Sequence, residues 1–209
     1  MKLTSESFPD NGAIPAKLAF CAMDPNAHAS LSQNLNPQLA WGAAPAGTKS
    51  FAILCHDPDV PSKGDDVNQE GRTVPASLPR VDFFHWVLVD LPPSVVSIGE
   101  GEFASSVTPK GKAGPDALYG ARQGINDYTG WFASDAEMAG NYFGYDGPCP
   151  PWNDEIAHRY VFTVFALDVA RLAVDGAFTG GAARKAMQGH VLAQAGVTGR
   201  YTLNPKVEL

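Results

Sequence analysis

The residues best suited to chemistry in this sequence are two aspartates held on a rigid turn. The stretch Ser50–Pro61, SFAILCHDPDVP, begins as an apolar run of strand length and ends with Asp57 and Asp59, which share their turn with Pro58 and Pro61. Because proline has a fixed φ and no N–H, we expect the strand to end here in a polar corner. Taken alone, such a pattern is most often an ordinary strand-ending turn.

Two further apolar runs each begin with a histidine beside a proline-rich turn. His85 lies near the start of residues 83–91, and His158 begins residues 158–167. A lone histidine in a buried strand is usually structural, so neither run by itself identifies a site. Strand alternation predicts that neighbouring side chains such as His85 and Trp86 face opposite sides of a sheet.

The elements that position these groups are expected to be β-strands. The 209 residues include 21 glycines and 17 prolines, which favours a loop-rich β protein over a helix bundle. Ser50–Pro61 begins with almost only apolar residues, so we expect a central strand covered on both faces. The sequence predicts a single, mainly β domain over residues 1–209, with a small helix at Ser134–Ala139, a helix at Gly181–Ala195 and a last short strand at 201–203.

Charge and hydropathy argue against several partners. The net charge is −7, from 22 acidic and 15 basic residues, and no block of lysine or arginine occurs. This composition argues against nucleic acid or an anionic membrane surface as the main partner. No apolar stretch approaches the roughly 20 residues that cross a bilayer, so no membrane insertion is expected.

The cysteines and the N-terminal residues predict a cytoplasmic protein. The first 15 residues contain no apolar run that resembles a secretory leader. Cys21, Cys55 and Cys149 are widely spaced and odd in number, so reduced thiols are expected rather than a disulfide framework.

Four segments of the sequence form a specific combination. They are Pro37–Trp41, Asp57–Pro61, Phe84–Val87, and Gly147–Pro151 followed by His158–Tyr160. Each segment alone is a weak signal, but their joint occurrence in this order is specific, and together they resemble the phosphatidylethanolamine-binding protein family, in its bacterial Raf kinase inhibitor-like branch. The resemblance implies an antiparallel β-sandwich with a few peripheral helices, including the one near the C-terminus.

The same resemblance implies one small pocket for phosphate or a phosphorylated headgroup such as that of a phospholipid. The loop Gly147–Pro151 would form one wall, and the expected residues are Asp57, Asp59, Pro61, His85, Gly147, Pro148, His158 and Tyr160. Imidazole N–H groups, the Tyr160 hydroxyl and loop amides are suitable donors to phosphate oxygens. Asp57 would accept from a histidine ring and favour its cationic form. Neither a metal nor a cofactor nor catalytic turnover is required.

Three alternatives stay open at this point. His85, His158 and Asp57 are also the ligand types of a facial-triad metal site, which would make the protein an enzyme. The resemblance also implies, for some relatives, a regulatory inhibitor of a kinase or protease. The aromatic-rich segment 94–146 would serve equally as a homodimer contact.

Overall fold

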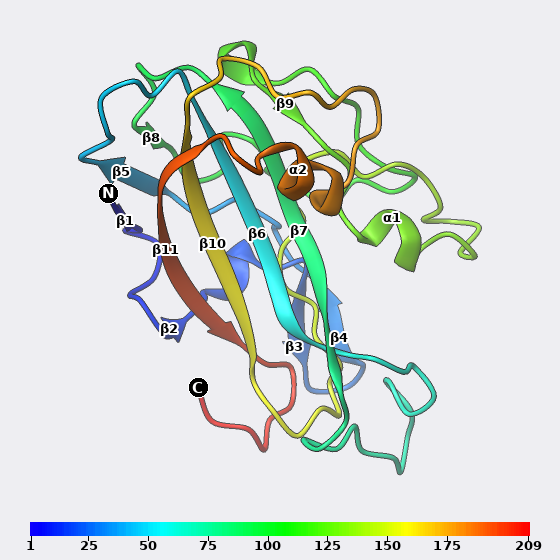
Figure 1. Cartoon of the computed structure of the whole chain (residues 1–209). Helices are drawn as coiled ribbons and strands as arrows, with labels where there is room; N and C mark the ends of the chain where they lie inside the picture. The colour runs from blue at the N-terminus through cyan, green and yellow to red at the C-terminus, as the bar shows by residue number, and fades with distance from the viewer.

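The fold is organised around a twisted sheet of six strands, and the computed structural model describes all 209 residues (Figure 1). All neighbouring strands pair antiparallel except the parallel pair of β11 and β2. In spatial order the strands are β2 (Gly12–Ala13), β11 (Val191–Tyr201), β10 (His158–Leu167), β6 (Ser50–Pro61), β7 (Arg80–Leu91) and β9 (Arg122–Gln123). The expected central position of β6 is confirmed, since it lies between β10 and β7.

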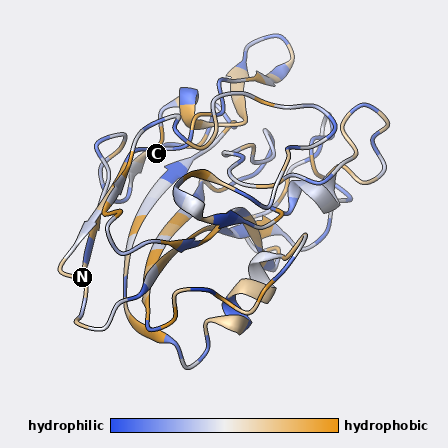
Figure 2. Ribbon diagram, turned by 90° about the horizontal axis from the view of Figure 1, so that it is seen from above, coloured by the Kyte–Doolittle hydropathy of each residue, from blue (hydrophilic) through white to orange (hydrophobic).

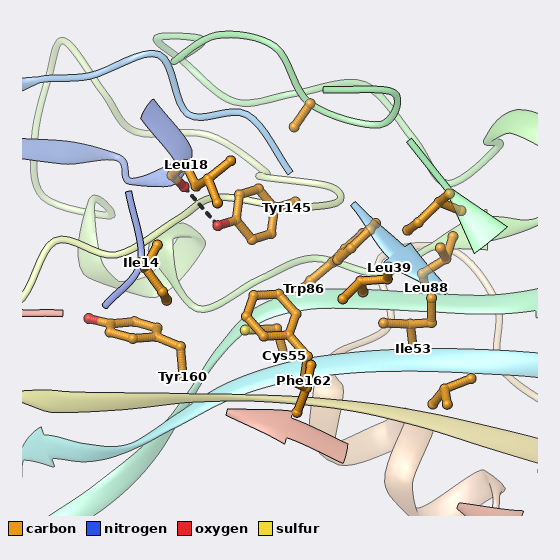
Figure 3. Close-up of a cluster of buried hydrophobic side chains, with 14 of the residues drawn as sticks. Ile14, Leu18, Leu39, Ile53, Cys55, Trp86, Leu88, Tyr145, Tyr160 and Phe162 are labelled. Carbon is orange, nitrogen blue, oxygen red and sulfur yellow. Dashed lines mark hydrogen bonds between the residues drawn. The ribbon is translucent and has the colours of Figure 1, made fainter. Parts of the chain in front are cut away.

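A second, smaller layer covers one face of this sheet. It contains the three-stranded sheet β1 (Lys2–Thr4), β5 (Leu39–Gly42) and β8 (Ser97–Ile98), and the hairpin β3 (Cys21–Asp24) and β4 (His28–Leu31). The larger hydrophobic core of 28 buried residues lies between the two layers. Figure 3 shows Trp86, Leu88 and Phe162 of the large sheet packed below Leu18 and Tyr145. The mainly β, sandwich-like fold expected from the sequence is confirmed.

The opposite face of the sheet carries a second core beneath α2 (Gly180–Ala186). Eleven buried residues form it, among them Ala52 and Leu54 of β6 and Ala183 of the helix. Because both faces of β6 are covered, its segment is apolar at nearly every position, and hydrophobic colour follows the long strands in Figure 2. The other helices are short: η1 (Ala16–Leu18), η2 (Leu118–Gly120) and α1 (Tyr128–Trp131).

The helix expected near the C-terminus was wrong in its boundaries, and the small helix expected at Ser134–Ala139 was wrong. The C-terminal helix ends at Ala186, and Gly189, with φ of 81°, turns the chain into strand β11. Pairing with β10 along the whole strand overrides the helical spacing of residues 181–195. Of the short strand expected at 201–203, only Tyr201 is in a strand, as the last residue of β11. In the other segment, the helix is Tyr128–Trp131, and Ser134–Ala139 forms turns.

Bulges changed two further expectations about the strands. The strand β6 continues through the expected polar corner to Pro61, with register shifts between Cys55 and His56 and between Asp57 and Val60. In β7, Trp86 pairs with Cys55 and Phe84 with His56, so His85 is an extra residue. His85 and Trp86 therefore both face the larger core, against the alternation predicted from the sequence.

The cysteine prediction was also wrong. Cys21 of β3 and Cys149 form a disulfide with an S–S distance of 2.05 Å, while Cys55 is a buried free thiol. The pairing was not visible in the sequence because the two residues are 128 positions apart and meet only through the fold. Disulfides are rare in reducing compartments, so this bond weighs against the cytoplasmic location, which stays a prediction. No helix is long and apolar enough to cross a membrane.

Candidate ligand-binding site

A cavity of about 470 Å³ lies where β6, β7 and β10 meet the β3–β4 hairpin and the loop Cys149–Pro151. Five of the eight residues expected at the site line it: Asp57, Pro61, His85, His158 and Tyr160. The other three, Asp59, Gly147 and Pro148, do not line this cavity. The sheet thus brings together side chains that are a hundred positions apart in the sequence.

His158 is held between two buried carboxylates. Its Nδ1 lies 2.7 Å from Asp57 Oδ2 and its Nε2 lies 3.1 Å from Asp154 Oδ2. Since carboxylate oxygens accept, both ring nitrogens donate and the ring is an imidazolium. Burial opposes this charge, but Asp57 and Asp154 raise the pKa of His158 to about 9. Neither N–H of His158 remains for a ligand, which differs from the role expected from the sequence.

Asp154 is itself fixed by Arg80. The guanidinium donates to both carboxylate oxygens, at 2.5 and 3.0 Å. Although burial opposes ionisation, the hydrogen bonds from His158 and Arg80 lower the pKa of Asp154. Two cations and two carboxylates, Arg80, Asp154, His158 and Asp57, therefore alternate in one buried chain of hydrogen bonds.

The two aspartates of the β6 turn have different roles. Asp57 Oδ1 accepts from the backbone N–H of Asp59 at 2.7 Å, so the proline-flanked turn fixes the carboxylate that faces the cavity. Asp59 turns away and accepts from the backbone N–H, Nε and Nη2 of Arg159, at 2.7 to 2.9 Å. Burial opposes ionisation, but these bonds lower the pKa of Asp59. Asp59 is a support of the turn rather than a wall of the cavity.

His85 has one ring nitrogen tied to the protein. Its Nδ1 lies 2.8 Å from the backbone carbonyl oxygen of Asp146. A carbonyl only accepts, so Nδ1 carries the proton and Nε2 of the neutral ring is free to accept. The ring packs edge-on against Tyr128 and Tyr160, with centroids 5.5 and 5.1 Å away. Burial lowers the pKa of His85, which keeps the ring neutral near neutral pH unless an anion favours its charged form.

Tyr160 provides an uncommitted hydroxyl on the same wall. Its side chain is buried and its hydroxyl makes no hydrogen bond, while burial and the nearby Asp57 carboxylate raise the pKa of that hydroxyl well above its usual value. Buried polar groups are normally paired, so an unpaired hydroxyl in a cavity wall indicates a place for a ligand or water. The neighbouring Tyr128 differs, because its hydroxyl donates to the Gly147 carbonyl at 2.9 Å.

The Gly147–Pro151 loop is structural at its first two residues. The Gly147 amide donates to Asn34 Oδ1 at 2.8 Å and is not available to a ligand. Gly147 is required for packing, because an added Cβ would overlap the carbonyl oxygen of Leu18. The Pro148 carbonyl accepts from the amides of Phe20 and Cys21 and ties the loop to β3. Only the end of the loop, from Cys149, reaches the cavity.

Most of the cavity wall is apolar. Phe83, Phe132 and Met138 line it together with the Cys21–Cys149 disulfide, and Lys63 supplies a cation among the lining residues. Trp131, which is 54% exposed, is also part of the lining. A charged group bound near His85 would therefore lie close to apolar surface suited to the uncharged part of the same ligand.

Sequence reasoning missed two residues that determine the state of the site. Asp154 is the second acceptor for His158, and its only signal was a carboxylate four residues before a histidine. Tyr128 stacks on Phe20 and packs against His85, but in the sequence it was one of several aromatics in a long segment. Neither contact can be read from sequence spacing alone.

The arrangement does not favour the metal-site alternative. No group of three or more His, Cys, Asp or Glu side chains is placed to hold a metal ion. Of the three ligands considered, His158 has both ring nitrogens bound to carboxylates, so it offers no lone pair to a metal in this state.

The comparisons with known proteins agree with the fold. The sequence profile of the phosphatidylethanolamine-binding protein family matches residues 4–202. The chain is 31% identical to the UPF0098 protein YbhB of Escherichia coli K12 over 202 residues, covering 97% of this chain and 100% of YbhB. The chain therefore belongs to the phosphatidylethanolamine-binding protein family, in the branch that includes YbhB and YbcL.

Two solved structures share this fold. The crystal structure of E. coli YbcL, described as a new member of the mammalian PEBP family, matches with a TM-score of 0.68 and 24% identity over 96% of this chain and 97% of YbcL. A putative phosphatidylethanolamine-binding protein homologue from Chlamydia trachomatis matches with a TM-score of 0.64 and 27% identity, over 96% of this chain and 95% of the other.

Proposed function

We propose that the protein is a non-catalytic binding protein whose cavity takes a phosphate or a phosphorylated headgroup, such as that of a phospholipid. The observation that carries this proposal is the pair of uncommitted groups on one wall, His85 Nε2 and the unpaired Tyr160 hydroxyl. Protonated His85 and Tyr160 would each donate to a phosphate oxygen, and charge-assisted bonds of this kind are the stronger ones.

The buried charges behind the wall support an anion despite the presence of Asp57. Its negative charge is matched by the imidazolium of His158, and Arg80 matches Asp154. The charges of these four hydrogen-bonded residues therefore balance one another before a ligand binds. An added anion then shifts His85 toward its charged form rather than meeting uncompensated carboxylates.

A calorimetric titration of inorganic phosphate and phosphoethanolamine at pH 5.5 and pH 8 tests the proposal. Because the pKa of His85 is lowered from 6.5, binding is expected to be stronger at the lower pH, where the ring gains its second donor more readily. His85→Ala and Tyr160→Phe should each weaken binding about tenfold or more.

His190→Ala is the matched control, because it removes a half-exposed histidine that pairs with Asp168 outside the cavity. It should leave the affinity unchanged. Equal affinities in all variants, or no heat at either pH, would overturn the proposal. A stronger response to phosphoethanolamine than to phosphate would show that the amine contributes, with Asp57 as the candidate partner.

A further inference from the structure

A second cleft lies on the opposite face of the sheet. It measures about 420 Å³ and is formed by the end of α2, the start of β11 and the outward side chains of β6 and β10. In Figure 1 this is the face that carries α2. The cleft shares no lining residue with the cavity of His85 and Tyr160. Its lining residues are His56, Thr163, Phe165, Arg184, Met187, Gln188, Gly189, Val191 and Gln194.

Two groups able to carry positive charge line this cleft around the ring of Phe84. The Arg184 guanidinium lies over that ring, 4.6 Å from its centroid, and the His56 ring centroid is 6.1 Å from it. Arg184 uses only Nη1, which donates to Asp82 at 2.7 Å, and stacking on Phe84 orients the rest of the planar fork. The remaining guanidinium N–H groups have no partner in the chain and are available to a ligand.

His56 adds a buried, uncommitted polar atom to the same cleft. Its Nδ1 is inaccessible to solvent and has no hydrogen-bond partner. Since His56 precedes Asp57 on β6, it reaches the outer face while Asp57 lines the other cavity. A buried nitrogen without a partner is unusual in a folded protein and indicates a group that a bound molecule or water can satisfy.

The composition of the lining selects the charge of the ligand. The chain has a net charge of −7, yet no aspartate or glutamate lines this cleft. Asp82 is engaged by Arg184, and Asp59 is engaged by Arg159. Burial and then the Arg184 charge lower the pKa of His56, so a bound anion would favour the charged form of this ring. The polar lining groups of Thr163, Gln188 and Gln194 are neutral and make no side-chain hydrogen bond within the chain.

We propose that this cleft binds a small organic anion, a carboxylate or a phosphate monoester, with its charged end between Arg184 and His56. The fork of an arginine matches the oxygens of either group. Phe165, Met187 and Val191 provide apolar contact for the body of the ligand, and the volume suits a molecule of one or two rings. This site is independent of the function proposed above.

Nuclear magnetic resonance of the ¹⁵N-labelled full chain tests the proposal, with phenyl phosphate and benzoate as probes. These molecules share a ring and differ in the charged group, so the one that binds more tightly identifies the preferred anion. The His56 ring signals should shift with saturation, and they should still do so in His85→Ala, which separates this cleft from the other cavity. Absence of a His56 shift with both probes would overturn the proposal.

Variants distinguish binding from an indirect effect. Arg184→Gln should weaken binding about tenfold or more, while Lys185→Gln, which removes an exposed charge from the same helix outside the cleft, should not change it. If Arg184→Gln fails to fold, Gln188→Glu places a carboxylate in the lining at an exposed position and should likewise weaken binding. Unchanged affinity in a folded Arg184→Gln or in Gln188→Glu would refute the assignment.

Discussion

Stability should fall as the pH rises from neutral to mildly alkaline, because of one buried histidine. His158 carries a pKa of about 9 in the folded protein, against 6.5 for a free side chain. Between these values the folded chain holds a proton that the unfolded chain has released. The free energy of unfolding therefore decreases with rising pH, by up to about 1.4 kcal/mol per pH unit for a single group.

The size of the effect follows from the two pKa values. The contribution of His158 is complete below pH 6.5 and is lost as the pH rises through about 9. Between pH 6.5 and 8.5 the expected loss is about 2 kcal/mol, a large fraction of a typical domain stability. The other buried histidine of the site, His85, has a pKa that burial lowers. Its protonation therefore favours the unfolded chain, so His85 decreases the free energy of unfolding as the pH falls below neutral.

Urea unfolding at pH 6.5, 7.5 and 8.5 measures this dependence. In His158→Gln the loss of stability over this range should disappear, while the protein is less stable at every pH because Asp57 and Asp154 lose their shared cation. His190→Gln, which removes a half-exposed histidine, should keep the dependence of the parent chain. A stability that is flat or rises between pH 6.5 and 8.5 in the parent chain would refute the imidazolium assignment.

Two further predictions concern the frame around the cavity. Replacing Cys21 and Cys149 together by alanine opens a covalent loop of sequence separation 128. In urea unfolding, this should lower the free energy of unfolding by about 2–5 kcal/mol. A loss below about 1 kcal/mol would contradict this expectation. Gly147→Ala should lower it by about 1–3 kcal/mol and weaken phosphate binding, because the new Cβ meets the Leu18 carbonyl oxygen. Gly181→Ala is the control, since an added Cβ there has room. Equal stability of the two glycine variants would refute the packing argument.

Local pattern alone determined the main strands and their central member. The runs at 50–61, 83–91 and 158–167 are apolar on both faces or alternate cleanly, and hydrophobic periodicity depends only on neighbouring residues. The joint motifs around Asp57, His85 and His158 also indicated the family and five of the residues that line the cavity. The strands could be predicted because each pattern is contained in a short stretch of sequence, and the family could be predicted because several such stretches occur together in one order.

Tertiary structure decided the features that depend on contacts between distant segments. Residues 191–201 became a strand because β10 offered a complete edge, which outweighs helical spacing. One extra residue in β7 turned His85 toward the larger core, and register is a property of two strands rather than one. The same holds for the Cys21–Cys149 bond and for the carboxylate pair around His158. Protonation and hydrogen-bond partners are set by what the fold places within about 3 Å, which sequence distance does not encode.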